Sequence, residues 1–403
     1  MAVNTMTFEQ CATVLNSLVQ QATGRASVVS TEPDFISVGQ LALSAGKDAV
    51  FNALSNVLAR TIFSVRPYSA TMTGLEKDLP TWGAYMRKFN IVASDWQVND
   101  AYKWPVTYDS TQTGHETGDG YAVDPWIIRK REFQQTNFLG QSVFADHYTV
   151  FEDQLETAFQ NSAEFGQFLS MLTTDMSNKI ELAKENVSRA LVANMIATLI
   201  TENNSARVVK LLTEYNTVTG GSYTATTIMQ PTNYGPFMKW AYARIASIAS
   251  MFKEMSTRYQ TTISSKPVPR HTPYNKQKLY ILNQDRYAME ARVLADTFHD
   301  NYLRFADVET INFWQGIETP DKIIMKPTYT NTSGVVTTAG SAVTQTGIFG
   351  LLFDEDAMGY AVVHKNVLPT PINPRGEYRN LFTNMRIRCF EDNCEKAVVF
   401  LLA

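Results

Sequence analysis

One stretch of the chain gathers carboxylates closely enough to suggest chemistry. Asp354, Glu355 and Asp356 are consecutive, and His364 follows shortly after them. Paired carboxylates can bind Mg²⁺ or Ca²⁺, or share a proton in acid–base catalysis. A metal-dependent enzyme that uses Asp354, Asp356 and His364 is one hypothesis. We favour a solvated turn between two strands, because the neighbouring sequence offers no further converging ligands.

The other residue types that carry out chemistry are scattered. The sequence has no Gly-rich phosphate loop, no Gly-x-Ser-x-Gly elbow and no His-Glu-x-x-His pair. Cys389 and Cys394 lack a second ligand pair for zinc, and with Cys11 they form an odd set that excludes a disulfide framework. We expect no enzyme, no metal and no cofactor. The histidines are isolated in sequence and receive no role: His115, His147, His271, His299 and His364.

The composition is typical of a folded protein and has no excess of basic residues. Hydrophobic residues make up 44% and charged residues 18% of 403 positions, and the formal net charge is −4. A dedicated nucleic-acid reader normally has a basic face and a high pI, so we expect any contact with DNA to be local and non-specific. No apolar run is long enough to span a bilayer, and the start of the sequence lacks a secretory pattern. We expect synthesis in the cytoplasm and no membrane partner.

The first 67 residues are interpreted as an N-terminal arm followed by a docking helix. Apolar residues recur at helical spacing over 7–20, with Thr7 and Gln10 matching a capping box and Gly24 marking the end of the helix. A turn is predicted at 31–34 and a second helix over 45–63.

Residues 68–150 indicate a long twisted hairpin with a polar tip. Strand-like limbs are expected over 85–94 and 127–144, and the glycines of the tip are Gly114, Gly118 and Gly120. Such a hairpin is not stable alone in water, so it requires a surface to lie on. Three basic residues, Arg129, Lys130 and Arg131, are predicted to form salt bridges with Glu181 and Glu185 of another subunit.

The strongest periodic signal runs over 164–201 and predicts one helix of about 50 Å. A shorter helix is expected over 151–160, and Gly166 lies near the junction, which makes it a candidate hinge. After residue 204 the pattern becomes mixed. Helices are predicted over 236–259 and 284–298, strands over 278–282, 323–326 and 348–353, and a surface loop over 328–347.

The final strand candidate, 397–402, is almost entirely apolar. An exposed strand of this kind would be prone to aggregation, so we expect its side chains to be buried and its backbone to be paired within a sheet. Upstream, Asn373, Pro374, Arg375 and Gly376 form a structural turn, which we interpret as locking an inserted lobe against the long helix.

Several short motifs carry a family resemblance. Residues 356–360 lead through His364-Lys365 to an Asn-Pro-Arg-Gly-x-Tyr turn at 373–378, and then to the strand at 397–400. In this order they resemble the major capsid proteins of tailed bacteriophages, with the Hong Kong ninety-seven-like fold, and especially the head proteins of phi twenty-nine-like podophages. The resemblance implies an α+β fold in four parts. These are an N-arm (1–67), an E-loop (68–150), a P-domain with a spine helix (151–204 and 360–403) and an A-domain (205–359).

The function that this resemblance implies is a major capsid protein. It would self-assemble as pentamers and hexamers into an icosahedral shell around double-stranded DNA, with a separate scaffolding protein and a portal as partners. It would be located in the virion capsid after synthesis in the bacterial host cytoplasm. The alternatives are an encapsulin-like nanocompartment shell, a tail or connector ring protein, and the metal-dependent enzyme.

Overall fold

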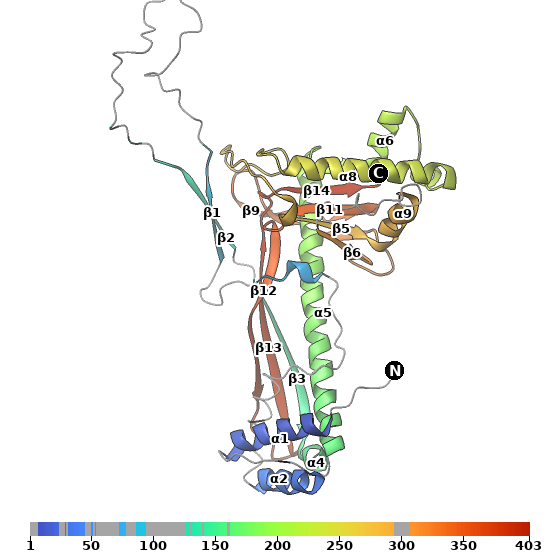
Figure 1. Ribbon diagram of the computed structural model, residues 1–403. Helices are drawn as coiled ribbons and strands as arrows, with labels where there is room; N and C mark the ends of the chain where they lie inside the picture. The colour runs from blue at the N-terminus through green and yellow to red at the C-terminus, as the bar shows by residue number, and fades with distance from the viewer. Residues whose placement is uncertain are drawn as a thin grey trace, which may run out of the picture.

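A computed structural model of the chain defines the fold. It describes residues 7–23, 29, 31–44, 50, 53, 72–77, 86–93, 126, 128, 130–138, 141–158, 162–293 and 307–403. One long helix forms the axis of the molecule, with a five-stranded sheet at one end, small helices at the other, and a hairpin that projects sideways (Figure 1).

The axis is α5, which spans Ser162–Glu202 and has 41 residues. At 1.5 Å per residue it is about 60 Å long, and it confirms the helix predicted over 164–201. Its two halves lie in different hydrophobic clusters, the first with α1 and α2 and the second with the sheets. Gly166 is buried within the first turns of this helix and does not separate it from α4 (Glu152–Ala158).

The five-stranded sheet has the order β4–β14–β11–β5–β6. Side chains alternate between its faces: Val399 and Leu401 of β14 join the cluster containing α5, while Val398 and Phe400 join the cluster containing α8. Because both faces are covered, the central strands are continuous apolar runs. The strands are β4 (Val208–Lys210), β5 (Gln277–Leu282), β6 (Asp307–Ile311), β11 (Ile348–Asp354) and β14 (Ala397–Leu401).

The prediction of a buried, paired final strand is therefore confirmed. All five residues of β14 are buried, and the strand pairs with β11 antiparallel and with β4 parallel. It shares this sheet with strands of the 205–359 segment, so a boundary at residue 359 would divide the sheet.

The helices around this sheet differ from prediction mainly at their ends. The predicted helix at 236–259 is α8, which spans Pro231–Phe252 and includes Pro236. The predicted helix at 284–298 is described as α9 (Asn283–Val293). Two further short helices are α6 (Leu211–Thr219) and α7 (Ala225–Ile228), and two 3-10 turns are η1 (Thr73–Leu75) and η3 (Tyr274–Lys276).

A three-stranded antiparallel sheet runs along α5 (Figure 1). Its order is β12 (Met358–Pro369), β13 (Tyr378–Glu391) and β3 (Gln141–Phe151). The segment 328–347, predicted as a loop, instead contributes three short strands. These are β8 (Thr328–Thr330), β9 (Val336–Thr338) and β10 (Val343–Gln345), of which β10 pairs with β7 (Ile323–Met325).

At the opposite end of α5 lie α1 (Phe8–Thr23), α2 (Glu32–Ser44) and α4 (Figure 1). The predicted capping box is confirmed, since the Thr7 N–H donates to Gln10 Oε1 at 3.0 Å and the Gln10 N–H donates to Thr7 Oγ1 at 3.4 Å. The turn predicted at 31–34 is wrong. Thr31 and Asp34 exchange the same kind of hydrogen bonds and begin α2. Gly24 and most of the helix predicted over 45–63 lie outside the described residues.

The hairpin consists of β1 (Met86–Ile91) and β2 (Phe133–Phe138), paired antiparallel from Met86↔Phe138 to Ile91↔Phe133. This confirms that the two predicted limbs pair. The return limb is shorter than predicted, because the chain after residue 140 leaves the hairpin and becomes β3. The tip glycines lie outside the described residues.

Candidate functional site

The carboxylates of the acidic cluster that suggested catalysis already contact other groups of the protein. Asp354 is buried and accepts hydrogen bonds from the Thr272 hydroxyl (2.5 Å) and the Asp356 N–H (2.8 Å). Lys77 lies 3.4 Å from Glu355 and 3.2 Å from Asp356. Within the described residues, no group of three or more histidine, cysteine or acidic side chains is arranged to hold a metal ion.

Of the two glutamates predicted to pair with the basic residues of the hairpin, only one reaches the surface. Lys130 and Arg131 are exposed, and Arg129 lies outside the described residues. Glu181 is partly exposed and lies 3.4 Å from Lys184. Glu185 is buried and accepts a 2.9 Å hydrogen bond from Arg189 Nε in the same chain. Glu185 is therefore paired inside its own subunit, and Glu181 is the more accessible of the two predicted partners.

A cluster of two buried carboxylates and two partly buried cations, which we call the hairpin clamp, joins β1 to the turn between β13 and β14. It consists of Lys88, Arg270, Asp392 and Glu395. Lys88 Nζ lies 2.9 Å from Asp392 and also contacts Glu395, which in turn contacts Arg270. The side chains of Asp392 and Glu395 are only 2% and 5% exposed.

The clamp shifts the pKa values of its members in ways that burial and pairing explain. Burial alone would raise the pKa of Asp392, but Lys88 and Arg270 lower it below its usual range. Burial would lower the pKa of Lys88, and the two carboxylates raise it instead. For Glu395 burial prevails, and its pKa is raised. Removing one member of a buried ion pair leaves an uncompensated charge, so the four residues depend on one another.

Contacts outside the clamp also attach the hairpin to the body. The rings of Phe138 and Phe390 have their centroids 5.8 Å apart, and Lys266 lies 2.5 Å from Glu132. The Ala93 N–H donates to the carbonyl of Pro267 at 2.9 Å. The base of the hairpin is therefore held on both limbs.

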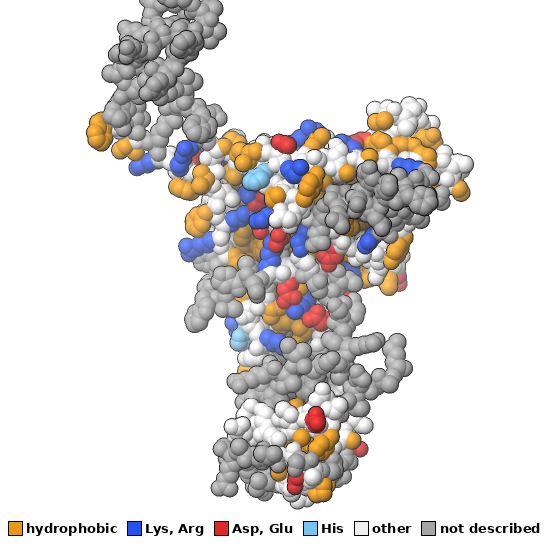
Figure 2. Space-filling view, in the orientation of Figure 1, with side chains coloured by type: hydrophobic (Ala, Val, Ile, Leu, Met, Phe, Trp, Pro, Cys, Tyr) orange, Lys and Arg blue, Asp and Glu red, His pale blue; other side chains and the backbone are white. Residues whose placement is uncertain are grey.

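Alongside these contacts, at residues that lie between or next to them in the chain, the hairpin exposes large apolar side chains. Phe89, Ile91 and Phe133 are 62%, 59% and 67% exposed, and Ile91 lies directly opposite Phe133. Trp126 and Ile128 are each 84% exposed. Hydrophobic side chains are visible where the hairpin leaves the body in Figure 2. Clustered apolar exposure of this kind marks an interaction surface.

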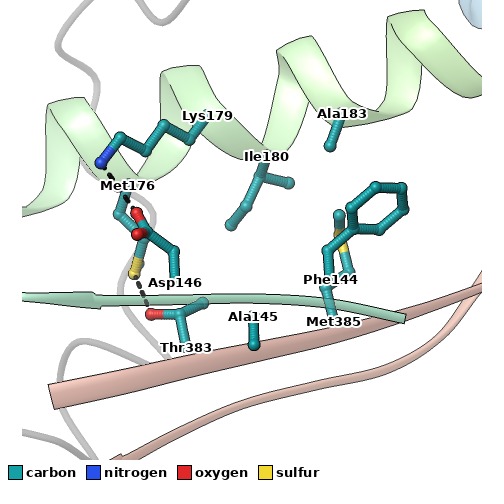
Figure 3. Close-up of a pocket in the computed structure, with 9 residues that line it drawn as sticks. All are labelled: Phe144, Ala145, Asp146, Met176, Lys179, Ile180, Ala183, Thr383 and Met385. Carbon is teal, nitrogen blue, oxygen red and sulfur yellow. Dashed lines mark hydrogen bonds and ion pairs between the residues drawn. The ribbon is translucent and has the colours of Figure 1, made fainter. Parts of the chain in front are cut away.

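A pocket of about 170 Å³ lies between α5 and the strands β3 and β13 (Figure 3). One end is apolar and the other is charged, with Asp146 and Lys179 2.8 Å apart. Lys179 also lies 3.1 Å from Asp175, which accepts a 2.7 Å hydrogen bond from the Tyr148 hydroxyl. The lining residues are Phe144, Ala145, Asp146, Met176, Lys179, Ile180, Ala183, Thr383 and Met385.

Two carboxylates therefore share one ammonium group at the charged end. The hydrogen bond with Lys179 is the main cause that lowers the pKa of Asp146, and the hydrogen bonds with Tyr148 and Lys179 lower the pKa of Asp175. Both carboxylates are ionised at neutral pH, and this end of the pocket carries a net negative charge.

The family is decided by a match of residues 44–401 to the model of the Phi29-like phage major capsid proteins. The chain belongs to this family. Its family is that of a structural capsid protein and not of an enzyme, and its role is to form the capsid shell from many copies. The resemblance stated from the sequence is confirmed.

Solved capsid structures have the same fold as this capsid protein. It is similar to a chain in the capsid structure of Staphylococcus phage Andhra, with 12% identity, coverage of 85% of this chain and 87% of that chain, and a TM-score of 0.51. It is also similar to a chain in a structure of the head fiber and inner core protein of native bacteriophage P68, with 10% identity, coverage of 85% and 87%, and a TM-score of 0.53. At these identities the likeness concerns the fold alone. A comparison with curated proteins finds no match.

The turn that suggested the family lies in a different part of the capsid protein from the one predicted. Asn373 Oδ1 accepts from the Arg375 N–H at 3.0 Å, and the Asn373 amide donates to the Tyr378 hydroxyl at 2.9 Å. The Glu152 N–H donates to Glu377 O, which places the turn beside α4, at the end of the molecule away from the five-stranded sheet (Figure 1). It shapes the reversal from β12 to β13, and it does not lock the lobe to the spine helix.

The hairpin clamp of the capsid protein was not predicted from its sequence. A partial signal exists, since 391–396 places four charged residues directly before the apolar final strand. Lys88 gave no signal of its own, because its partners lie about 300 residues away along the chain. No helix among the described residues has the length and apolar character of a membrane span.

Proposed function

We propose that this protein assembles as pentamers and hexamers into an icosahedral shell that encloses the double-stranded DNA of a tailed phage. The observation that carries the proposal is the family match over 44–401, joined to a hairpin whose apolar face has no cover among the described residues. A separate scaffolding protein and a portal act with it, and its contacts with DNA are non-specific. It is made in the cytoplasm of the bacterial host and ends in the virion capsid.

The parts of the subunit take the roles of their counterparts in the fold family. Residues 1–67 act as the N-arm and 68–150 as the E-loop. The P-domain combines 151–204 with the strands β12 and β13. The A-domain comprises 205–359 together with β14, because β14 lies in the same sheet as β4, β5, β6 and β11.

The hairpin lies across a neighbouring subunit and contributes to shell assembly. Burial of its apolar face against that neighbour removes Phe89, Ile91 and Phe133 from water, and each large side chain stabilises the contact by about 1.5–3 kcal/mol. Lys130, Arg131 and Arg129 add charge pairing with acidic groups of the neighbour, among which Glu181 remains a candidate. Each contact is modest, and the closed shell gains stability from many of them.

The clamp sets the direction in which the hairpin leaves the body. Since Lys88 pairs with two carboxylates that are almost fully buried, the base of the hairpin moves with the β13–β14 turn. Movement between shell states then occurs beyond the base, or by bending of α5 near Gly166, which we retain as a hinge candidate.

Co-expression with the scaffolding protein of the same phage, followed by electron microscopy, tests this function. We expect closed shells with five-fold and six-fold capsomers. Replacement of Arg129, Lys130 and Arg131 by Glu should reduce shell yield at least tenfold while the subunit stays folded by circular dichroism. Fixed rings or dispersed particles from the unmodified chain would refute the shell, and undiminished shells from the triple variant would refute the charge pairing.

A further inference from the structure

The segment that leads from β13 to β14 is polar and yet buried. We refer to residues 391–396 as the β13–β14 turn; four of these residues are charged, and 392–396 are all buried. Connections between strands usually lie on the surface, and a charged group is costly in the interior unless it is paired or hydrogen-bonded. The burial of this turn therefore depends on the contacts that its side chains make.

The middle of the turn holds two elements in addition to the hairpin. The clamp carboxylates already bind Lys88 of the hairpin. Asn393 lies between them in the chain and is 3% exposed, and its amide donates to Glu202 Oε1, at the end of α5, at 2.7 Å. The same amide donates to the carbonyl of Thr330 in β8 at 2.8 Å. Neighbouring side chains of the turn thus reach the hairpin, the spine helix and β8.

The last residue of the turn holds α8. Lys396 is fully buried, and its ammonium group donates to the carbonyl oxygens of Phe252 and Glu254 at 2.9 Å and 2.7 Å. These carbonyls lie at and just after the C-terminal end of α8, where backbone oxygens lack partners within the helix and a positive charge is favourable. The end of α8 is therefore attached to the same turn as the hairpin.

The first residue of the turn adds a second link to α5 and β8. Glu391 accepts a 2.7 Å hydrogen bond from the amide of Asn194 in α5. Asn194 also exchanges two 2.9 Å hydrogen bonds with the backbone of Thr328 in β8. The turn thus lies where these elements meet, at the end of α5 that carries the five-stranded sheet (Figure 1).

The turn is also braced internally. One carboxylate oxygen of Asp392 lies 2.9 Å from Lys88, and the other accepts a 3.0 Å hydrogen bond from the Cys394 N–H. The Glu395 N–H donates to the carbonyl of Asp392 at 3.2 Å. The group that pairs with the hairpin therefore also fixes the backbone from which the side chains bound to α5 and α8 extend.

We propose that the β13–β14 turn couples the hairpin to the spine helix and to the lobe that carries α8, so that these parts of one subunit loosen together. Side chains within one network of hydrogen bonds and ion pairs do not act independently, and a cooperative unit of a fold opens as a whole. The coupling gives the hairpin a second role, which rests on the proposed function. In the shell, a displacement of the hairpin by a neighbouring subunit is transmitted to the lobe of the same subunit.

Hydrogen exchange in the free subunit tests the coupling. Asn393→Ala removes the contacts with α5 and β8, and among the described residues its side chain has no hydrogen bond to the hairpin or to α8. We nevertheless expect amide exchange to become at least about fivefold faster in β1 and in the last turn of α8. Exchange in α1, at the opposite end of α5, should stay unchanged, which excludes a general loss of stability.

Asn373→Ala is the matched control, because it makes the same change at the reversal between β12 and β13. It should leave exchange in β1 and α8 as it is in the parent. Faster exchange confined to α5 and β8 after Asn393→Ala, or the same response from both variants, would overturn the coupling.

A double-mutant cycle tests the coupling if Asn393→Ala does not fold. Lys88→Met and Lys396→Met remove two ammonium groups that share no partner among the described residues. Urea titrations give the factor by which each variant lowers the equilibrium constant for folding. The factor for the double variant should be at least about fivefold smaller than the product of the two single factors, because the first change already loosens the second site.

The control pair is Lys88→Met with Lys179→Met. Lys179 binds Asp146 and Asp175 beside the first half of α5, away from the turn, so the two factors should multiply to within about twofold. Factors that multiply in both pairs contradict the coupling.

The outcomes separate the coupling from the proposed function. Both measurements use the free subunit, so a negative result overturns the coupling and leaves the proposed shell intact. A failure of the unmodified chain to form shells with its scaffolding protein overturns the proposed function and the second role of the hairpin, and leaves the coupling within the subunit in place.

Discussion

Phe400 in β14 is fully buried, whereas Phe133 in β2 is 67% exposed. Both are aromatic residues in short strands, yet the chain covers one on two sides with α8 and neighbouring strands and leaves the other open. The five-stranded sheet completes its burial within one subunit. In the proposed shell the hairpin completes its burial against another subunit, and folding and assembly then depend on different apolar surfaces of the same chain.

The largest effect should come from the same substitution made in each region. Phe400→Asp places a carboxylate in the cluster between the sheet and α8, and we expect a loss of at least about 4 kcal/mol in the free energy of unfolding and no soluble folded subunit. Phe133→Asp should change that free energy by less than about 0.5 kcal/mol, because the side chain is exposed in the free subunit.

The two variants should separate again when assembly is measured. Phe133→Asp is expected to give folded subunits by circular dichroism and at least tenfold fewer shells by sedimentation. Normal shells from Phe133→Asp, or a folded subunit from Phe400→Asp, would remove the distinction between the two surfaces.

We call the five-stranded sheet and the helices packed on its two faces the self-contained region. Its elements could be predicted because their patterns of apolar residues are long or continuous. Apolar residues repeat along nearly the whole of α5, and β11 and β14 are uninterrupted apolar runs. Their partners could not be predicted in the same way. The parallel pairing of β14 with β4 joins residues about 190 apart, and nothing in the local pattern sets that register.

The candidate site was harder to predict, because charge in a sequence does not show where the charge lies in the fold. Glu185 and Glu181 occupy similar positions in the helical pattern of the sequence. In the fold, however, Glu185 is buried and paired with Arg189. Lys88 is one lysine in a polar segment and becomes the centre of the clamp only through the distant Asp392 and Glu395.

The next effect in size concerns the clamp, which links the two regions. Lys88→Met leaves Asp392 and Glu395 with Arg270 as the remaining cation, and we expect a loss of about 3 kcal/mol in the free energy of unfolding. Lys77→Met is the matched control, since its partners Glu355 and Asp356 are 38% and 52% exposed, and it should cost about 0.5 kcal/mol. Urea unfolding measures both. Equal losses would show that burial of the partners does not govern the clamp.

A pH dependence of stability is expected from Glu391, the last residue of β13. Burial raises the pKa of Glu391 to about 8, although Asn194 donates a 2.7 Å hydrogen bond to it. The folded state thus holds a proton between pH 4.5 and about 8 that the unfolded state has released, and stability falls as pH rises through this range.

Glu391→Gln removes that titration. We expect the variant to match the parent at pH 4.5 and to exceed it at pH 6.5 by on the order of 2 kcal/mol, read from thermal unfolding at each pH. Glu318→Gln makes the same substitution at an exposed position and is the matched control. A parallel profile for parent and Glu391→Gln would mean that this carboxyl is already ionised in the fold.

The smallest effect is expected at a helix end that contributes to neither surface. Thr7→Ala removes the side chain that accepts from the Gln10 N–H, and such caps contribute about 1 kcal/mol to their helix. Amide hydrogen exchange in α1 should then become about fivefold faster, with exchange in the five-stranded sheet unchanged. Thr13→Ala is the matched control within α1. Its hydroxyl donates to the Glu9 carbonyl at 2.7 Å, a bond that competes with the helix and does not cap it, so protection should stay the same or increase. Faster exchange in the sheet after Thr7→Ala would mean that α1 and the sheet unfold as one unit, and the self-contained region would then extend along the whole of α5.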